Sequence, residues 1–241
     1  MKNFIVLDVE GYSTCKPYNI GYIVGNKKGE ILDSKSFALM PAVWDNLEYK
    51  YRTANVEGLK GAHEMAHTNI KEILCTDNDK YNKIFDNSRF FGDFLADITK
   101  YEVKRIWAYN CTFDKGALMR LFNEQQSQII NNLVTFCDII PAILHTRLLT
   151  SEYVEFCKAN EFMTEKGNVQ TKAEVVYRYL TGNLQFVEEH TGLADCEIEY
   201  QILLEAMRTS NNVKYAPCQA WKVIQKFCES EGIYIPALDN I

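Results

Sequence analysis

Apolar runs of strand length, rich in β-branched residues, mark the first part of the chain and two later places. The five runs are 3–7, 18–24, 31–39, 105–109 and 133–137. Gly11 breaks the first run, and the segment 25–29 (Gly-Asn-Lys-Lys-Gly) has the composition of a tight turn between the second and the third. The pattern therefore predicts three consecutive strands joined by short connections, followed later by two more.

Apolar residues recur at helical spacing through much of the remaining chain. The predicted helical segments are 112–123, 139–157, 171–180, 194–207 and 219–230. Residues 41–101 are polar, aromatic-rich and mostly helical in pattern. This order of elements indicates an α/β fold with a mixed sheet. We expect one domain over 1–210, with a largely helical insertion at about 40–103 between strands 3 and 4, and a C-terminal helical extension over 211–241.

Composition narrows the class of protein. Of the 241 residues, 47% are hydrophobic and 24% are charged, which is ordinary for a folded globular chain. The longest apolar stretch, 139–144, is far shorter than the roughly 18 residues that a membrane span needs. The first residues lack the layout of a signal peptide, so we expect a cytoplasmic protein with no membrane partner.

The cysteines and the net charge each limit the class of protein further. The eight cysteines are scattered without a C-x-x-C pair, which favours reduced thiols that pack as small apolar side chains. The formal net charge of −6 excludes a broadly basic protein that coats phosphates. It leaves nucleic acid open as a partner if several carboxylates surround divalent metal ions.

The end of the first strand carries the first candidate motif, Asp8-Val9-Glu10. Side chains two positions apart on a strand point to the same face, so both carboxylates would emerge together. Two neighbouring carboxylates repel one another unless a cation bridges them, and oxygen ligands suit Mg²⁺ or Mn²⁺. A pair of solvated turn residues is the alternative interpretation.

Two further motifs lie at the starts of predicted helices. Asp114 falls in the first helical turn after the fourth strand, where a carboxylate also complements the helix dipole or caps the helix. His190 and Asp195 are five positions apart, a rotation of roughly 140° along a helix, so they cannot share one helical stripe. We expect His190 on a loop and Asp195 inside the helix that follows.

Taken together, the three motifs occur in a fixed order along the chain. They are Asp8-x-Glu10, Asn110-x-x-Phe113-Asp114 and His190-x4-Asp195. In this order the chain resembles the DEDDh family of 3′→5′ exonucleases, which includes the proofreading epsilon subunit of bacterial DNA polymerase III. The resemblance covers roughly residues 3–38 and 104–206, and the stretch 172–195 looks like that of phage-type members.

The resemblance implies a fold and a set of site residues. The fold would be ribonuclease H-like: a five-stranded mixed sheet with an antiparallel second strand, flanked by helices. The family binds two Mg²⁺ or Mn²⁺ ions, and the matching ligands here are Asp8, Glu10, Asp114 and Asp195, with His190 as general base. Substrate contacts are implied for a further set of residues: Val9, Gly11, Tyr12, Asn110 and Phe113.

The implied activity is the release of nucleoside 5′-monophosphates from a nucleic-acid 3′ end. Single-stranded DNA is the favoured substrate, and a polymerase or another replication protein is a candidate partner. An exoribonuclease of the same family is an alternative, because a contact to the 2′-hydroxyl is not visible in a sequence. A non-catalytic nucleic-acid-binding relative is another alternative, although all five chemical positions are occupied.

The chain departs from the family pattern at two places. Gly11-Tyr12-Ser13-Thr14 stands where a Thr-rich segment is usual, and Tyr109 stands where a His often precedes the Asn of the second motif. Neither change replaces a metal ligand or the base. The departures therefore affect the expected contacts to the substrate terminus.

His63-Glu64-Met65-Ala66-His67 matches the H-E-x-x-H helix motif of zinc peptidases. No Gly or third His follows at the spacing of the longer motif, so we expect an ordinary surface helix. A metal held by His63 and His67 and a zinc peptidase are kept as remote alternatives.

Other polar and aromatic residues have simpler interpretations. We expect Asp138 to be a helix N-cap rather than a metal ligand. Several aromatic residues are expected to pack in the core rather than to stack on bases. They are Tyr12, Trp44, Tyr49, Tyr51, Phe90 and Phe91.

Overall fold

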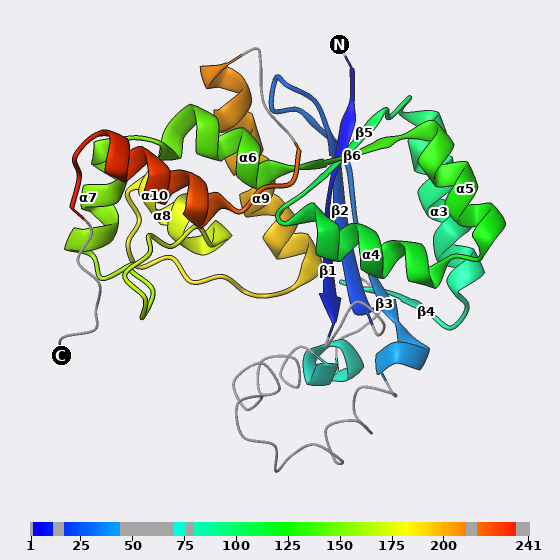
Figure 1. Cartoon of the computed structure of the whole chain (residues 1–241). Coiled ribbons are helices and arrows are strands. Elements are labelled where there is room, and N and C mark those ends of the chain that lie inside the picture. Colours follow the sequence, from blue (N-terminus) through cyan, green and yellow to red (C-terminus); the bar gives the residue numbers. More distant parts are fainter. Residues whose placement is uncertain (1, 12–16, 44–69, 76–79, 211–215, 235–241) are drawn as a thin grey trace. The chain divides into compact units, whose positions relative to one another are not determined.

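The sheet is six-stranded and mixed, with strand order β4-β3-β2-β1-β5-β6 (Figure 1). The computed structural model describes residues 2–11, 17–43, 70–75, 80–210 and 216–234. The strands are β1 (Phe4–Gly11), β2 (Pro17–Gly25), β3 (Ile31–Leu39), β4 (Asn82–Ile84), β5 (Arg105–Ala108) and β6 (Thr135–Asp138). β2 runs antiparallel to both β1 and β3, while β5 is parallel to β1 and β4 is parallel to β3. The predictions of an α/β fold and of an antiparallel second strand are confirmed.

The helices named for the described residues follow the predicted segments closely, with one addition. They are α3 (Asn87–Lys100), α4 (Cys111–Leu121), α5 (Glu124–Leu133), α6 (Ile139–Ile143), the π-helix η1 (Leu144–Leu148), α7 (Ser151–Ala159), α8 (Ala173–Thr181), α9 (Gly192–Thr209) and α10 (Ala220–Ser230). None of the predicted helical segments corresponds to α5. A capping box between Asn123 and Gln126 defines the start of that helix.

The chain forms two compact units. Residues up to 137 group with 189–197, and residues 138–188 group with those from 198 onwards. The first unit contains β1 to β5, β6 up to Cys137, α3, α4, α5 and the beginning of α9. The second contains α6 to α8, the remainder of α9 and α10, so the predicted C-terminal extension contributes α10 to it.

The predicted count of five strands is wrong, because β4 adds a sixth. β4 lies within the predicted insertion and pairs in parallel with the end of β3, where Phe37 faces Asn82 and Leu39 faces Ile84. A strand of three residues is too short to show an alternating pattern, so no local signal marks it. In the described part of the predicted insertion, the chain thus contributes a strand as well as helix.

A hydrophobic core fills one face of the sheet, under α3, α4 and α5. Alternate β1 residues, Ile5, Leu7 and Val9, belong to this core. Phe90 of α3 is fully buried there, and Phe91 packs edge-on against Phe122. The prediction that these two phenylalanines are packing residues is confirmed. Because side chains alternate along a strand, the intervening β1 residues point to the opposite face of the sheet.

The second unit is held by aromatic packing and by helix caps. The Tyr153 ring packs against Phe156 and Tyr179, and its hydroxyl donates a 2.7 Å hydrogen bond to the carbonyl of Gln170. Asp138 caps α6 by accepting a hydrogen bond from the Ile140 amide, as predicted. The unit thus has its own apolar interior, built largely from α6, α7 and α8.

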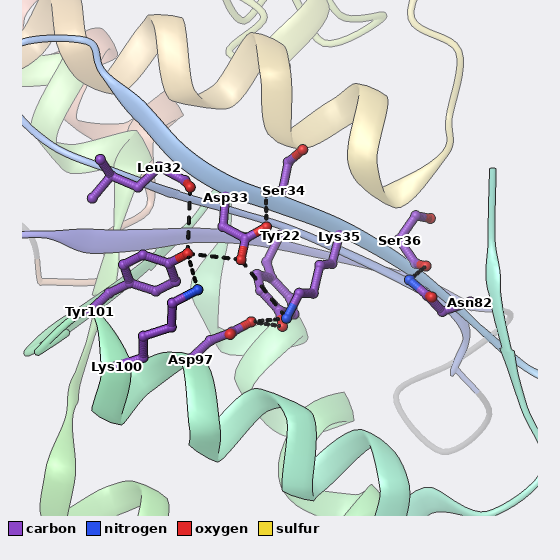
Figure 2. A network of polar contacts seen from close by, with 10 residues as sticks. All are labelled: Tyr22, Leu32, Asp33, Ser34, Lys35, Ser36, Asn82, Asp97, Lys100 and Tyr101. Atoms are coloured by element: carbon purple, nitrogen blue, oxygen red, sulfur yellow. Dashed lines mark hydrogen bonds and ion pairs between the residues drawn. The ribbon is translucent and has the colours of Figure 1, made fainter. Parts of the chain in front are cut away.

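Two polar side chains donate hydrogen bonds to backbone carbonyl groups in the first part of β3 (Figure 2). The Asn82 amide donates to the carbonyl of Ser36 at 3.1 Å, and the Tyr101 hydroxyl donates to the carbonyl of Leu32 at 3.5 Å. In the described residues β4 pairs with β3 only from Phe37 onwards. These side chains therefore protect a strand edge that would otherwise offer hydrogen bonds to another chain.

A buried carboxylate joins α3 to the sheet in the same network (Figure 2). Asp97 is 4% exposed and accepts a 2.7 Å hydrogen bond from the Tyr22 hydroxyl and another from the Lys35 ammonium group. Burial and the bond to Asp97 raise the pKa of Tyr22 far above its ordinary value. The network compensates the cost of burying a charge by pairing it and satisfying it with hydrogen bonds.

The described residues bear on two broader expectations, which concern membrane-spanning helices and the cysteines. No helix found there combines the length and the apolar composition needed to cross a membrane. The cysteines described are all free thiols, and five of them are buried: Cys111, Cys137, Cys157, Cys196 and Cys228. Five of the seven described cysteines thus pack as small apolar side chains, as predicted, whereas Cys75 is exposed and Cys218 is partly exposed.

Candidate metal and active site

The last residues of β1 carry Asp8 and Glu10 on the face opposite the α3–α5 core. Both side chains are half-buried, and the residue between them, Val9, is buried in that core. In the antiparallel ladder with β2, Asp8 lies opposite Gly21 and Glu10 lies opposite Asn19. The two carboxylates thus emerge on one face at the end of a buried strand, as the motif predicts.

Asp114 reaches the backbone of β1 from the first turn of α4. Its side chain is 3% exposed, and Oδ1 accepts a 3.1 Å hydrogen bond from the amide nitrogen of Val9. That amide lies between Asp8 and Glu10 in the chain. Asp114 was expected either to serve the site or only to complement the helix dipole. The structure gives it a specific partner 105 positions away, beside the carboxylate pair.

The turn before α4 has an unusual backbone conformation. Asn110 is the N-cap residue, with φ of 64° and ψ of 48°, and its side chain makes no capping hydrogen bond. Asn tolerates the left-handed region better than most residues, because its short side chain interacts locally with the backbone. The conformation turns the chain sharply from β5 into α4, which brings Asp114 to the end of β1.

His190 and Asp195 lie on the predicted loop and in the predicted helix, respectively. His190 is half-buried on the loop before α9 and has a left-handed backbone with φ of 54°. Asp195 is 5% exposed in the first turn of the helix, where its amide donates to the carbonyl of Thr191 at 2.9 Å. The sharp turn at His190 and the start of α9 set the spacing between the imidazole and the carboxylate.

Glu10, His190 and Asp195 converge. Each offers one ligand atom, and these atoms all lie within 4.8 Å of one another. Ligands around one divalent ion at about 2.0–2.3 Å are at most roughly 4.6 Å apart, so the group is close to the size of one coordination sphere. The two carboxylates offer oxygen ligands that suit Mg²⁺ or Mn²⁺, and an imidazole beside them can serve as a ligand or as a base.

Two buried carboxylate oxygens belong to the motif residues Asp8 and Asp195. Oδ2 of Asp8 and Oδ1 of Asp195 are both buried and accept no hydrogen bond, although both residues have other interactions. Asp8 and Asp114 do not belong to the group of three ligand atoms within 4.8 Å. The four acids and His190 nevertheless all lie in the first compact unit, around the end of β1.

The residues to which the resemblance assigns substrate contacts have varied environments. Val9 contributes its side chain to the core and its amide to Asp114, whereas Gly11 ends β1 at a register shift. Asn110 is exposed and Phe113 is half-buried at the start of α4. Tyr12 lies outside the described residues, as do Trp44, Tyr49, Tyr51 and the segment from His63 to His67.

Two residues of β2, Asn19 and Gly21, belong to the surroundings of the site but were not singled out from the sequence. They lie opposite Glu10 and Asp8 in the sheet. Asn and Gly are both unfavourable in the interior of a strand, and here they interrupt the otherwise apolar strand Pro17–Gly25. That local conflict is the signal that could have identified them.

Comparison with known proteins adds no family assignment to this geometry. A scan against models of known protein families finds no match, and no curated protein sequence is significantly similar to the chain.

Proposed function

We propose that this protein is a metal-dependent 3′→5′ exonuclease with a ribonuclease H-like fold. The observation that carries the proposal is the convergence of Glu10, His190 and Asp195, with ligand atoms within 4.8 Å of one another. Glu10 and His190 are 180 positions apart in the chain. The convergence involves residues of two of the three sequence motifs, and Asp114 of the remaining motif contacts β1 between Asp8 and Glu10.

The sheet supports the proposed fold. Three antiparallel strands are followed by β5, which pairs in parallel with β1 on the side away from β2. The additional strand β4 extends the far edge beyond β3. The candidate site therefore lies at the end of the central strand β1, where the neighbouring β5 leads into the helix that bears Asp114.

The negative charge of the four acids is the reason why the proposed site needs a cation. Asp8, Glu10, Asp114 and Asp195 would repel the phosphodiester of a nucleic acid if no positive charge lay among them. Asp8, Glu10 and Asp195 would hold one divalent ion, and Asp114 would assist at a second. When bound, the ions supply Lewis-acid stabilisation of the charge that develops on the phosphoryl oxygens.

His190 is the proposed general base. It accepts a proton from the water whose oxygen attacks the terminal phosphorus. The bond from phosphorus to the preceding 3′ oxygen breaks, and that oxygen takes a proton from solvent. The products are a nucleoside 5′-monophosphate and a strand that is one residue shorter and ends in a 3′-hydroxyl. Imidazole suits this role because it exchanges protons near neutral pH.

The proposal is tested by incubation with 3′-labelled and 5′-labelled single strands of DNA and RNA of one sequence. The incubations contain Mg²⁺, Mn²⁺ or EDTA. We expect metal-dependent shortening from the 3′ end, faster on DNA, and none with EDTA. Faster cleavage of RNA would identify the exoribonuclease alternative. No cleavage with either metal would contradict the enzyme and favour a nucleic-acid-binding module.

Site variants tie the activity to the proposed residues. Asp8→Asn and His190→Ala should abolish cleavage while leaving the thermal unfolding transition in place. Matched controls are Glu165→Gln, an exposed acid, and His145→Ala, an exposed histidine of η1, both of which should retain activity. Full activity in either site variant would overturn the assignment.

A further inference from the structure

Asn19 is a buried polar residue that lies directly opposite Glu10 in the ladder of β1 and β2. It is 1% exposed, although asparagine is depleted in strands and in protein interiors. Both ends of its side-chain amide make hydrogen bonds. Nδ2 donates to the carbonyl of Phe37 at 2.8 Å and to Ser36 Oγ at 3.2 Å, both on β3.

The remaining atom of this amide connects the sheet to α9. Oδ1 of Asn19 accepts a 2.8 Å hydrogen bond from the amide nitrogen of Gly192, the first residue of that helix. The first amides of a helix have no partner within the helix, and a neighbouring side chain usually satisfies one of them. Here the cap comes from a residue 173 positions earlier in the chain.

The capped segment is the one that brings His190 and Asp195 to Glu10. Gly192 lies two residues after His190 and three before Asp195. His190 has a left-handed backbone, a conformation that persists only where the surrounding structure determines it. The Asn19–Gly192 hydrogen bond supplies such a determinant beside the cluster.

We propose that Asn19 is a positioning residue of the metal cluster, because it fixes the start of α9 to the sheet and so holds His190 and Asp195 near Glu10. The inference rests on the proposed function of that cluster. An amide is required because one end must accept from Gly192 while the other donates to Phe37. A carboxylate only accepts, and the single oxygen of a hydroxyl cannot lie beside both partners at once.

The experiment measures Mn²⁺ binding to the full chain by titration calorimetry, together with the rise in Tm that Mn²⁺ produces. Asn19→Leu removes all three hydrogen bonds, and Asn19→Thr is a second variant that suits a strand but cannot span both ends. Ser36→Ala is the matched control, because it removes only the weaker 3.2 Å contact on the side away from Gly192. Glu10→Gln removes a proposed ligand.

We expect the Kd for Mn²⁺ to rise roughly 10- to 100-fold in both Asn19 variants, the range seen when residues that orient metal ligands are removed. Ser36→Ala should stay within about twofold of the unchanged protein. The metal-induced rise in Tm should shrink in the Asn19 variants, because it depends on the Kd. A residue that only stabilises the fold would lower the metal-free Tm and leave that rise unchanged.

Different results separate the two proposals. If the unchanged protein binds Mn²⁺ and Glu10→Gln weakens binding, but both Asn19 variants bind as tightly as Ser36→Ala, the positioning role is wrong and the metal site stands. If the unchanged protein binds no Mn²⁺, or Glu10→Gln has no effect, the metal site itself is wrong and the positioning role falls with it.

Discussion

Gly21 of β2 and Gly192 of α9 lie in backbone contact. A Cβ atom added at Gly21 would lie 2.1 Å from the carbonyl carbon of Gly192, and one added at Gly192 would lie 2.5 Å from the amide nitrogen of Gly21. Gly21 also lies opposite Asp8 in the sheet. The absence of both side chains allows the start of α9 to approach the sheet beside the candidate ligands.

Gly21→Ala should therefore disturb both stability and the site. The added methyl group meets backbone rather than a flexible side chain, so the segment 190–195 must move. We expect a loss of about 1–3 kcal/mol in the free energy of unfolding, as for other overpacked interiors. Urea denaturation measures that loss, and Mn²⁺ titration of the folded variant should show weakened binding.

Gly92→Ala is the control for this substitution. Gly92 is exposed within α3, and a Cβ atom there would meet nothing within 4 Å. Alanine should stabilise the helix by roughly 0.5–1 kcal/mol. The close approach of Gly21 to Gly192 would be contradicted if the two alanine variants had the same stability.

Asp114 combines a structural and a proposed chemical role, which two substitutions can separate. Asp114→Ala leaves the buried amide of Val9 without its acceptor, and such a loss costs about 1–3 kcal/mol. Asp114→Asn keeps an oxygen that can accept from Val9, so its unfolding free energy should fall by less than about 1 kcal/mol. Both variants should lose cleavage. Equal unfolding free energies in the two variants would argue against the hydrogen bond.

The Tyr22–Asp97 hydrogen bond should stabilise the fold in a pH-dependent manner. A hydrogen bond to a charged group contributes about 1.5–3 kcal/mol, so Tyr22→Phe should lower the unfolding free energy by that amount at pH 8. Burial and Asp97 raise the pKa of Tyr22 in the folded protein above the ordinary value of about 10. The folded state therefore keeps the proton after the unfolded state has begun to release it.

The upward direction of this pKa shift determines how the free energy of unfolding changes with pH. The contribution of the hydroxyl is complete below pH 10 and decreases as the pH rises further, by about 1.4 kcal/mol per unit. The difference in unfolding free energy between the unchanged protein and Tyr22→Phe should thus narrow above pH 10. Urea titrations at several pH values from 8 upwards measure it, and a constant difference across that range would contradict the argument.

Thiol reactivity should follow burial. Cys75 is exposed, whereas Cys137 and Cys157 are buried, and burial raises the pKa of each of these two thiols to about 11. Because the thiolate is the reactive form, Cys75 should react with a disulfide reagent well before the other two. Mass spectrometry of the labelled protein identifies the order of modification. Early labelling of Cys137 or Cys157 in the folded protein would contradict their burial.

The two buried thiols also predict weaker folding at alkaline pH. Their raised pKa values mean that stability is fully present below about pH 8.5, the ordinary pKa of a thiol, and declines as the pH rises towards 11. Cys137→Ala and Cys157→Ala should each reduce this decline. Unfolding free energies at pH 8 and pH 10 provide the measurement, and an unchanged decline in both variants would be evidence against the effect.

Local patterns in the chain were sufficient to predict most elements near the site. The strand predicted at 31–39 matches β3, Asp114 lies in the first turn of its helix, and His190 precedes the helix that contains Asp195. These features depend on strand alternation, helical spacing and helix-start signals, all of which involve neighbours in the sequence. The presence of metal, nucleic acid and catalysis stays a prediction from the motifs.

Other features depend on the tertiary structure because their partners are distant in the chain. β4 forms through its pairing with β3, and a strand of three residues carries no local sequence pattern that predicts this pairing. The Asp114–Val9 hydrogen bond spans 105 positions, and the Asn19–Gly192 hydrogen bond spans 173. The sequence by itself thus determined which residues offer the chemistry and on which elements they lie. Only packing decided that Glu10, His190 and Asp195 meet, because long-range contacts depend on how the elements close together rather than on local periodicity.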